Sequence, residues 1–358
     1  MKPFNVGVVG YGWAAGAHIA AINATSLGQV VAVCSSRPLE ARELSARHGR
    51  AMRTYTDYAA MLRQPDLHVV SICIYHHQHA AQAVAAAQAG KHIICEKPLA
   101  LSLADVDAIA AAVRAAGVKF CVCFELRFSA LFRETKRLLD TGALGQLHYG
   151  EIDYYHGIGP WYREYEWCTT HAGCGSSLLA AGCHALDALL LCLGDDVEDV
   201  FAWSARSAHP IFARYEYPST TVTLLKFKDG RVGKCASAID CWQPYYFHTH
   251  LLGSEGSLRD DLYHSNRTAG PEGRQEWKHL PFKPVDSGDV ADHPYQTQFA
   301  AFFEAVARGE EMPLTGLEPA VRTHEVVFAS EESLRRGRPV NFAEFCQRRP
   351  NTQQNTAS

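Results

Sequence analysis

Apolar strand-like runs alternate with helical patterns along the first third of the chain. The run at residues 4–10 leads into a helical pattern at 14–23, in which Ile19 and Ile22 face inward. Further strand-like runs lie at 29–34, 67–74, 92–95 and 119–123, and further helical segments end at His48 or span 57–62, 79–89 and 103–116. Strands separated by helices of this length predict right-handed crossovers and a doubly wound parallel sheet.

The pattern changes after residue 124. A helix at 130–140, a strand at 146–155 and a helix at 178–193 come first. Strand-like runs then follow with short turns, such as Lys228-Asp229-Gly230, and lie at residues 200–206, 220–227, 231–239 and 246–252. Consecutive strands joined by short turns pair antiparallel. We expect one broad sheet with helices on one face, followed by helices at 295–308 and 319–336.

These patterns predict an α/β protein with two domains and a tail. The doubly wound parallel sheet occupies residues 1–124, and a C-terminal α+β domain with a large, mostly antiparallel open sheet occupies 125–345. The polar segment at 263–292 predicts a long loop, and residues 346–358 predict a disordered tail. The sheet face without helices predicts a homodimer or homotetramer assembled through the C-terminal sheet.

Composition narrows the choice of partners. The 358 residues are too many for one ordinary core, and a net charge of -4 without runs of like charge indicates neither nucleic acid nor a membrane surface as partner. The N-terminus shows neither a signal peptide nor a spanning helix, so we expect a cytoplasmic protein. Several of the 12 cysteines lie in or beside apolar runs, which predicts reduced thiols.

A glycine-rich turn joins the first strand to the first helix. Gly10-Tyr11-Gly12-Trp13-Ala14 begins a G-x-G-x-x-A pattern that ends at Ala15. The first glycine permits a tight turn, the second lets the backbone approach a pyrophosphate, and the small third residue lets the helix pack closely. Amides at the helix start then face the phosphates. This context predicts a dinucleotide-binding Rossmann domain.

The end of the second strand bears on the choice of dinucleotide. An acidic residue there accepts hydrogen bonds from the ribose and repels a 2′-phosphate. This chain instead has Ser35, Ser36 and Arg37. Two hydroxyl groups and a guanidinium favour NADP over NAD, although Arg37 could simply begin the following helix.

Glu96 and Lys97 follow a short apolar strand at 92–95, bounded by Gly90 and Pro98. The carboxyl edge of an open parallel sheet is where ligands bind, so Lys97 can reach a bound molecule. In isolation the two charges are more typical of a solvated strand-to-loop ion pair.

Tyr75-His76-His77-Gln78-His79 follows another strand at this edge. The histidines lack acidic or thiol partners at a helical offset, so we expect the loop to cover the nicotinamide and expect no metal. The predicted dinucleotide-binding residues are Gly10, Tyr11, Gly12, Trp13, Ala14, Ser35, Ser36, Arg37, Ile74, Tyr75, His76, His79, Glu96 and Lys97. A zinc set of Cys168, His171, Cys174 and Cys183 is possible by spacing but is not our expectation.

Four motifs together resemble one known family. They are the glycine-rich turn, Glu96-Lys97-Pro98, the stretch from Gly182 to Asp187, and His293-Pro294-Tyr295-Gln296. This combination resembles the glucose-fructose oxidoreductase, inositol dehydrogenase and MocA (Gfo/Idh/MocA) family over roughly residues 4–340. The resemblance implies a nicotinamide cofactor and redox chemistry at a secondary alcohol of a sugar, cyclitol or related ring. It also implies that Lys97 is the catalytic lysine and His184 the catalytic-helix histidine.

The chemistry explains these residue types. Hydride transfer from a carbinol carbon requires a base that removes the hydroxyl proton, and a lysine destabilised by burial and by the oxidised ring is such a base. His184 shares that proton or holds the oxygen. The chain departs from the family where Ala180 occupies the usual aspartate position and Ile74-Tyr75-His76 replaces Thr-Pro-Asn.

Aromatic and polar residues before the catalytic helix suit a sugar ring, with its apolar faces and polar rim. The predicted substrate-binding residues are Arg127, Tyr155, His156, Trp161, Arg163, Trp167 and His184. The leading hypothesis is reversible NAD(P)-dependent hydride transfer at a ring hydroxyl of a sugar, glycoside or cyclitol. Glycoside cleavage through transient oxidation and elimination, or a non-enzymatic dinucleotide-binding regulator, are the alternatives.

Overall fold

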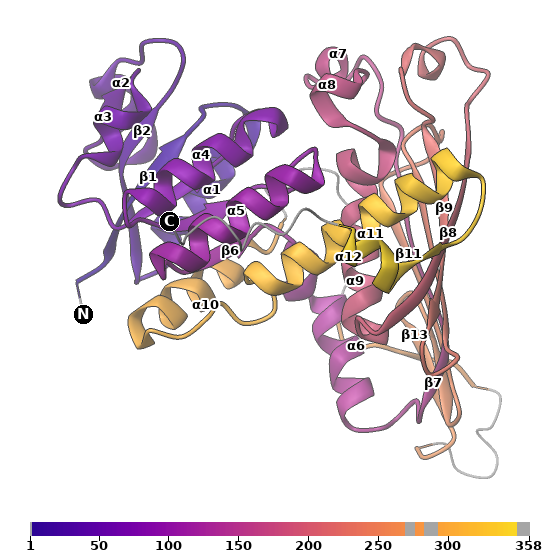
Figure 1. Cartoon of the computed structure of the whole chain (residues 1–358). Helices are drawn as coiled ribbons and strands as arrows, with labels where there is room; N and C mark the ends of the chain where they lie inside the picture. Colours follow the sequence, from indigo (N-terminus) through magenta and orange to yellow (C-terminus); the bar gives the residue numbers. More distant parts are fainter. Residues whose placement is uncertain (1, 269–275, 283–292, 349–358) are drawn as a thin grey trace, which may run out of the picture.

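A computed structural model describes residues 2–268, 276–282 and 293–348 of the chain. The molecule has two units, each built on one sheet (Figure 1). The N-terminal unit contains a parallel sheet with helices packed around it. The C-terminal unit is a broad sheet whose helices lie between it and the first unit.

Within the described residues, the first sheet has six strands in the order β3-β2-β1-β4-β5-β6. All their pairings are parallel. The strands are β1 (Phe4–Val9), β2 (Gly28–Cys34), β3 (Arg53–Tyr55), β4 (Val69–Ile72), β5 (His92–Cys95) and β6 (Phe120–Val122). This is the order of a dinucleotide-binding sheet, whose ligand edge lies at the carboxyl ends of the strands. The predicted doubly wound parallel sheet is therefore confirmed.

Local signals explain where the helices of this unit start and stop. The Ser102 side chain accepts a hydrogen bond from the amide of Asp105, and Gly117, at φ 63°, ends the same helix. The helices are α1 (Trp13–Ala24), α2 (Ala41–His48), α3 (Tyr58–Leu62), α4 (His79–Gln88) and α5 (Leu103–Ala116), with short 3-10 turns η1 (His76–Gln78) and η2 (Glu125–Phe128).

The second sheet has nine strands within the described residues, in the order β14-β13-β12-β11-β7-β10-β9-β8-β15. Neighbouring strands pair antiparallel except β7 and β10, which pair parallel. The strands are β7 (Leu147–Tyr155), β8 (Val197–Ala205), β9 (Thr220–Phe227), β10 (Val232–Ala238), β11 (Tyr246–Gly253), β12 (Gly256–Arg259), β13 (Leu262–Ser265), β14 (Lys278–His279) and β15 (Val340–Asn341). The large, mostly antiparallel sheet is as predicted.

Helices cover one face of this sheet (Figure 1). Alternation along β9 explains the choice of face, because Thr221, Thr223 and Leu225 are buried whereas Leu224 is exposed. The helices and short turns of this part are α6 (Ala130–Asp140), α7 (Tyr165–Cys168), α8 (His171–Cys174), the π-helical η3 (Leu178–Gly182), α9 (Cys183–Leu193), η4 (Phe212–Arg214), α11 (Leu317–Arg336) and α12 (Phe342–Gln347).

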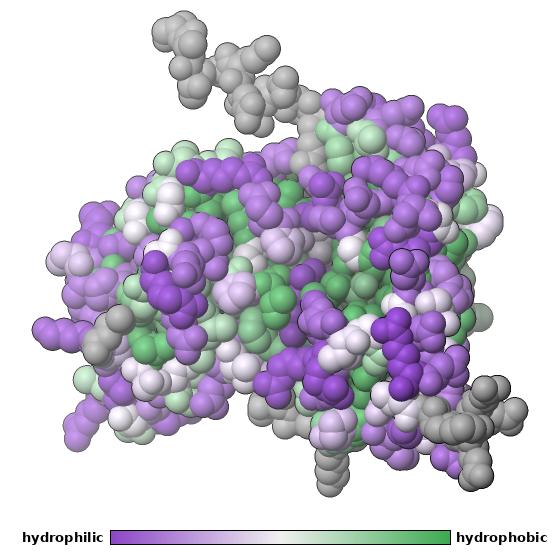
Figure 2. Space-filling view, turned by 90° about the horizontal axis from the view of Figure 1, so that it is seen from below, coloured by the Kyte–Doolittle hydropathy of each residue, from purple (hydrophilic) through white to green (hydrophobic). Residues whose placement is uncertain are grey.

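One helical stretch of the described residues, His171–Leu193, is apolar and long enough by composition to cross a membrane. Its most apolar window is 89% buried inside the molecule, so it is the core helix of the second unit. In the view from below, hydrophobic residues gather toward the middle of the face and hydrophilic ones dominate its rim (Figure 2).

The C-terminal segments return to both units. Helix α10 (Tyr295–Arg308) packs on α1, and its Phe299, Phe302 and Phe303 join the core of the first unit. The prediction of one long loop at 263–292 is wrong in part, because β13 and β14 form a polar edge of the second sheet there. Residues 269–275, 283–292 and the predicted disordered end, 349–358, lie outside the described residues.

Candidate active site

A cleft of about 490 Å³ lies at the carboxyl edge of the first sheet, where the second unit faces it. The first unit contributes residues that follow β1, β2, β4 and β5. The second unit contributes residues from the end of β7, the segment around α7 and α8, η3 and α9, and His293 and Tyr295 line the cleft from the start of α10, which packs on the first unit. The cleft therefore has a glycine-rich wall and an aromatic and polar wall.

The glycine-rich wall has the geometry that a pyrophosphate needs. Gly10 has φ 91°, and a Cβ there would lie 2.0 Å from the carbonyl oxygen of Cys73. Gly12 is the N-cap of α1, no side chain caps the helix, and a Cβ on Gly12 would meet no atom within 4 Å. The first amides of α1 thus face open cleft, as a dinucleotide phosphate site requires. Gly10, Tyr11, Gly12, Trp13 and Ala14 all line the cleft.

Ser35, Ser36 and Arg37 also line the cleft, after the end of β2. The hydroxyl oxygen of Ser35 accepts a hydrogen bond of 3.4 Å from the amide of Arg37. This contact holds the turn so that all three residues face the region where an adenosine ribose would lie.

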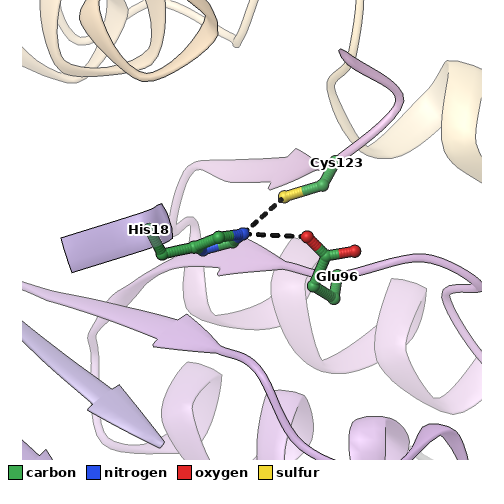
Figure 3. A group of neighbouring side chains, drawn as sticks. All are labelled: His18, Glu96 and Cys123. Atoms are coloured by element: carbon green, nitrogen blue, oxygen red, sulfur yellow. Dashed lines mark hydrogen bonds and ion pairs between the residues drawn. The ribbon is translucent and has the colours of Figure 1, made fainter. Parts of the chain in front are cut away.

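Glu96 lines the cleft, and Figure 3 shows it beside His18 and Cys123. His18 Nε2 lies 2.8 Å from its Oε1, and the Tyr295 hydroxyl donates a 2.6 Å hydrogen bond to the same oxygen. His18 Nε2 also lies 3.9 Å from the sulfur of Cys123. Burial opposes the charges of the Glu96 carboxylate and the His18 imidazolium, but His18 and Lys97 hold the pKa of Glu96 far below its ordinary value. Cys73 and Glu96 outweigh the burial of His18 and raise its pKa to about 10.

Lys97 lies at the meeting point of the two units. Its ammonium donates a 3.2 Å hydrogen bond to the backbone carbonyl of Ala180, in η3. Burial favours the neutral amine, yet Cys183, Glu96 and Glu125 outweigh burial and raise the pKa of Lys97. The net direction is therefore opposite to the one that burial alone would give.

His184 lines the cleft from the first turn of α9. Its Nδ1 lies 3.4 Å from Oε2 of Glu125, which η2 supplies from the other side of the ring. His293 Nε2 lies 3.6 Å from the second carboxyl oxygen of Glu125. Burial, followed by the charge of Lys97, lowers the pKa of His184 well below its ordinary value. Burial, followed by Glu96, raises the pKa of Glu125 to about 8.

The loop after β4 contributes Ile74, Tyr75 and His76 to the cleft. The rings of Tyr75 and His76 meet the edge of Trp167 at centroid distances of 5.3 and 5.0 Å. His79 is buried behind them, where its ring nitrogens contact the carbonyls of Pro98 at 2.7 Å and Ile74 at 3.0 Å. His79 therefore fixes the loop and does not line the cleft.

A chain of hydrogen bonds runs along the wall that the second unit supplies. The Tyr154 hydroxyl lies 2.8 Å from His156 Nδ1, and His156 Nε2 lies 2.6 Å from the Tyr162 hydroxyl. Burial, followed by Lys97, lowers the pKa of His156 to about 4, so it is neutral near pH 7. Arg163 and Trp167 line the cleft as well. Such an array of rings and hydroxyls suits a polyhydroxylated ring.

Three predicted substrate-binding residues lie outside the cleft lining. The Arg127 guanidinium forms a buried ion pair of 2.6 Å with Asp187 and joins η2 to α9. Tyr155 is on the opposite face of β7 from Tyr154, and its hydroxyl donates to Asp153 at 2.9 Å. The Trp161 indole donates to the carbonyl of Gly157 at 3.0 Å and remains half exposed.

The sequence interpretation did not assign a role to every residue of the site. Tyr245, Cys168 and Cys174 line the cleft, and Glu125 stands behind His184. The apolar neighbours of Glu125 in sequence give no sign that it is buried beside an imidazole. The strand ends that converge on this cleft are visible only after the two sheets are placed together.

Two groups of possible metal ligands occur among the described residues. One is His18, Glu96 and Cys123, in which the histidine and carboxylate already pair. The other is Glu151, His248 and His250 on the second sheet, where the ammonium of Lys234 contacts Glu151 at 2.5 Å. Neither group lies among the four residues weighed as a zinc set, Cys168, His171, Cys174 and Cys183.

Two family models match the chain. The model described as "Oxidoreductase family, NAD-binding Rossmann fold" matches residues 4–124. The model described as "GFO/IDH/MocA C-terminal domain" matches residues 132–259.

The similarity to curated relatives and to solved structures extends over almost the whole chain. Myo-inositol 2-dehydrogenase of Thermotoga maritima is 24% identical over 341 residues, which cover 95% of this chain and 98% of the relative. Scyllo-inositol 2-dehydrogenase (NAD(+)) of Bacillus subtilis is 26% identical over 321 residues, covering 89% and 90%. The structure of a levoglucosan dehydrogenase in complex with NADH and levoglucosan superposes with a TM-score of 0.82 at 23% identity, covering 95% and 99%.

Proposed function

The chain belongs to the Gfo/Idh/MocA family of NAD-binding oxidoreductases, and on this premise we propose that it is a ring-alcohol dehydrogenase. Its reaction is reversible hydride transfer between a nicotinamide dinucleotide and a secondary hydroxyl of a sugar, glycoside or cyclitol. One observation carries the proposal: Lys97 and His184, from different units, line the same cleft as the glycine turn.

The residues of the first unit fit a dinucleotide. Gly10 and Gly12 leave room for the pyrophosphate, and the uncapped amides of α1 provide its hydrogen-bond donors. When bound, the oxidised nicotinamide accepts a hydride from the substrate carbon. We propose NADP as the preferred form, because Ser35, Ser36 and Arg37 put hydroxyl and guanidinium donors where an acid would repel a 2′-phosphate.

Lys97 and His184 manage the proton of the reacting hydroxyl. The Lys97 ammonium donates a hydrogen bond to the oxygen and stabilises the negative charge that develops on it. His184 presents its ring to the same oxygen. His156, Tyr162 and Trp167 orient the remaining hydroxyls and faces of the ring.

A substrate panel tests the proposal. Purified protein is mixed with NAD⁺ or NADP⁺ and with myo-inositol, scyllo-inositol, levoglucosan and simple glycosides, and the absorbance of the reduced nicotinamide is followed. Turnover of at least one ring alcohol supports the dehydrogenase. Glycoside cleavage without net cofactor reduction, or cofactor binding without turnover of any alcohol, contradicts it.

We also propose that copies of the chain assemble through the open face of the second sheet, in a cytoplasmic protein. Trp203 on β8, Leu224 on β9 and Val232 on β10 are exposed apolar side chains on three adjacent strands, and Tyr246 is exposed on β11. Exposed apolar side chains on the open face of a sheet are typical of a subunit interface.

A further inference from the structure

The carboxyl group that usually accompanies the lysine is absent from position 180. The Lys97 ammonium meets only the backbone carbonyl of Ala180 there, at 3.2 Å. A buried carboxyl does stand close by, because Glu125 faces His184 from η2. Glu125 is 1% exposed and does not itself line the cleft, so it can reach the substrate only through another residue.

Glu125 and His184 have unsatisfied polar atoms that point at each other. Oε2 of Glu125 and Nδ1 of His184 are buried, neither has a hydrogen-bond partner, and 3.4 Å separates them. A buried polar atom without a partner is costly, and catalytic hydrogen bonds often tighten only when substrate binds. A small rotation of either side chain would put one proton between these atoms.

We propose that Glu125 is a positioning residue that holds the proton which His184 exchanges with the substrate oxygen. It thereby supplies from η2 the carboxyl that Ala180 lacks. This inference rests on the proposed dehydrogenase function. His293, whose Nε2 lies 3.6 Å from the other carboxyl oxygen and which lines the cleft, connects Glu125 to solvent.

The surroundings of Glu125 are consistent with a stored proton. The titratable groups that face Glu125 and affect its charge include Lys97 and Glu96 after β5, His184 and Asp187 on α9, His293 and Tyr295 at the start of α10, and Tyr245 before β11. Burial raises the pKa of Glu125 to about 8 and lowers that of His184 far below its ordinary value. Near pH 7 a neutral acid therefore faces a neutral imidazole, and the acid donates to Nδ1 while Nε2 carries the other proton.

The proton transfers balance in both directions. During reduction, His184 Nε2–H gives its proton to the carbonyl oxygen as hydride reaches the carbon, and Nδ1 takes the proton of Glu125. The products are an alcohol, a neutral imidazole with its proton on Nδ1, and a Glu125 carboxylate. Oxidation runs the same transfers backwards. The imidazole never has to carry a lasting positive charge, which its burial disfavours.

The variant Glu125→Gln tests this role because it keeps the shape of the side chain and removes the exchangeable proton. We expect kcat to fall about 100-fold, with KM and dinucleotide Kd within about threefold of the parent values. The limb of the pH profile near pH 8 should disappear. Glu331→Gln is the matched control, because Glu331, in α11, is a half-buried carboxyl that accepts a hydrogen bond from Ser176 away from the cleft, and its loss should leave kcat unchanged.

A rescue experiment separates this role from a structural one. Adding Ala180→Asp to Glu125→Gln should raise kcat at least about tenfold above that of Glu125→Gln alone, because a carboxyl again stands beside Lys97 and His184. A kcat for Glu125→Gln within twofold of the parent would overturn the inference. So would an unchanged pH profile.

Infrared spectroscopy tests the stored proton even without a substrate. The parent-minus-variant difference spectrum at pH 7 should contain the carbonyl band of a protonated carboxyl for Glu125→Gln. A carboxylate band in its place would overturn the inference. The dehydrogenase proposal fails separately, if the parent protein turns over no ring alcohol.

A second observation concerns two thiols on the opposite wall of the cleft. The sulfur atoms of Cys168, at the end of α7, and Cys174, at the end of α8, lie 3.0 Å apart. Cys174 also lies 3.6 Å from Nδ1 of His76, in the loop after β4. Both cysteines line the cleft, so a small oxidant can reach them.

We infer that Cys168 and Cys174 form a reversible dithiol–disulfide site whose oxidant is a hydroperoxide. The Cys168 thiolate attacks a peroxide oxygen, forms a sulfenic acid and releases hydroxide or alkoxide. The Cys174 thiol then displaces water from that sulfur and closes the disulfide. Two thiols are oxidised by two electrons and the peroxide is reduced. The hydrogen bond from the Cys174 thiol lowers the pKa of Cys168. Cys168 is therefore the thiol that attacks the peroxide first.

Peptide mapping after hydrogen peroxide treatment tests the site. We expect one linked peptide that joins Cys168 to Cys174 and disappears with dithiothreitol. Cys174→Ser should instead trap a sulfenic acid on Cys168 that dimedone labels. Cys241→Ser, at a half-buried cysteine elsewhere, is the control and should keep the linked peptide. Peroxide treatment that oxidises Cys241 but forms no link between Cys168 and Cys174 would overturn the inference.

Discussion

At the scale of single residues, burial and neighbouring charge compete in the cleft. Burial lowers the pKa of Lys97, but Cys183 and Glu96 outweigh burial and raise it, whereas burial raises the pKa of Glu125, which keeps its proton near pH 7. Lys97 and His184 could be predicted from the motifs around them. The place of Glu125 could not, because its contact with His184 joins η2 to α9 across 58 intervening positions. Arg127 shows the opposite error, since a charged residue near the site pairs within the fold.

Ionisation of Glu125 should make folding stability depend on pH. Its folded pKa of about 8 exceeds the ordinary value of 4.5, so the folded state binds more protons and loses stability as pH rises between these values. Glu125→Gln does not titrate. The unfolding free energy of the variant minus that of the parent should therefore increase by about a few kcal/mol between pH 4.5 and about pH 8 and stay constant above pH 8. Denaturant melts across this range would contradict the assignment if the two proteins kept a constant difference.

Arg37 should decide the preference for NADP. Arg37→Ser removes a guanidinium that can bind the 2′-phosphate, and hydrogen bonds to charged groups contribute about 1.5–3 kcal/mol. We expect NADP⁺ affinity to fall about tenfold or more while NAD⁺ affinity changes less than about twofold. Arg42→Ser, an exposed arginine of α2 away from the cleft, is the control. Equal losses for both dinucleotides in titration calorimetry would argue against this role.

At the scale of elements, local signals predicted the bounds of β5, α5, α6, β9 and α10 correctly. Ser102 and Gly117, for example, cap the two ends of α5. The sequence patterns did not predict the three-residue edge strand β3. Arg53–Tyr55 pairs with a neighbouring strand on one side only, and three residues are too few to show the alternation of apolar and polar side chains that marks a strand. The π-helical η3 was predicted as ordinary helix, because sequence periodicity does not separate one wide turn from its neighbours.

The turn between β1 and α1 should tolerate no side chain at its first glycine. Gly10 and Gly90 both have positive φ, but a Cβ at Gly10 would collide with the Cys73 carbonyl whereas one at Gly90 would meet nothing within 4 Å. Gly90→Ala should cost about 1 kcal/mol, from the left-handed backbone alone. Gly10→Ala should cost about 3 kcal/mol or more and weaken dinucleotide binding. Similar urea midpoints for the two variants would contradict the steric argument.

At the scale of the whole molecule, the alternation of strands and helices predicted both sheets and that helices cover one face of the second. Both family models confirm the resemblance drawn from the four motifs. The parallel pairing of β7 with β10 could not be predicted, because these strands are separated by three α-helices and two other strands. Nor could the return of α10 to the first unit, where Phe299 and Phe303 complete a core that begins at β1.

Assembly through the open face of the second sheet makes a further prediction. Leu224→Asp adds a charge to an exposed apolar patch on β9 and leaves the buried face of that strand unchanged. We expect light scattering after size exclusion to show an oligomer for the parent and a monomer for the variant. Lys228→Asp, in the exposed turn after β9, should leave the oligomer intact. A parent protein that is monomeric at micromolar concentration would exclude this assembly.

The convergence of Lys97 and His184 on one reacting carbon is tested most directly by rapid-mixing kinetics of Lys97→Met. With an alcohol found in the substrate panel, we expect the hydride-transfer rate to fall at least about 1,000-fold, because the developing charge on oxygen loses its donor. Dinucleotide Kd should stay within about threefold, and Lys228→Met should react like the parent. A Lys97→Met variant that transfers hydride at the parent rate would contradict the account.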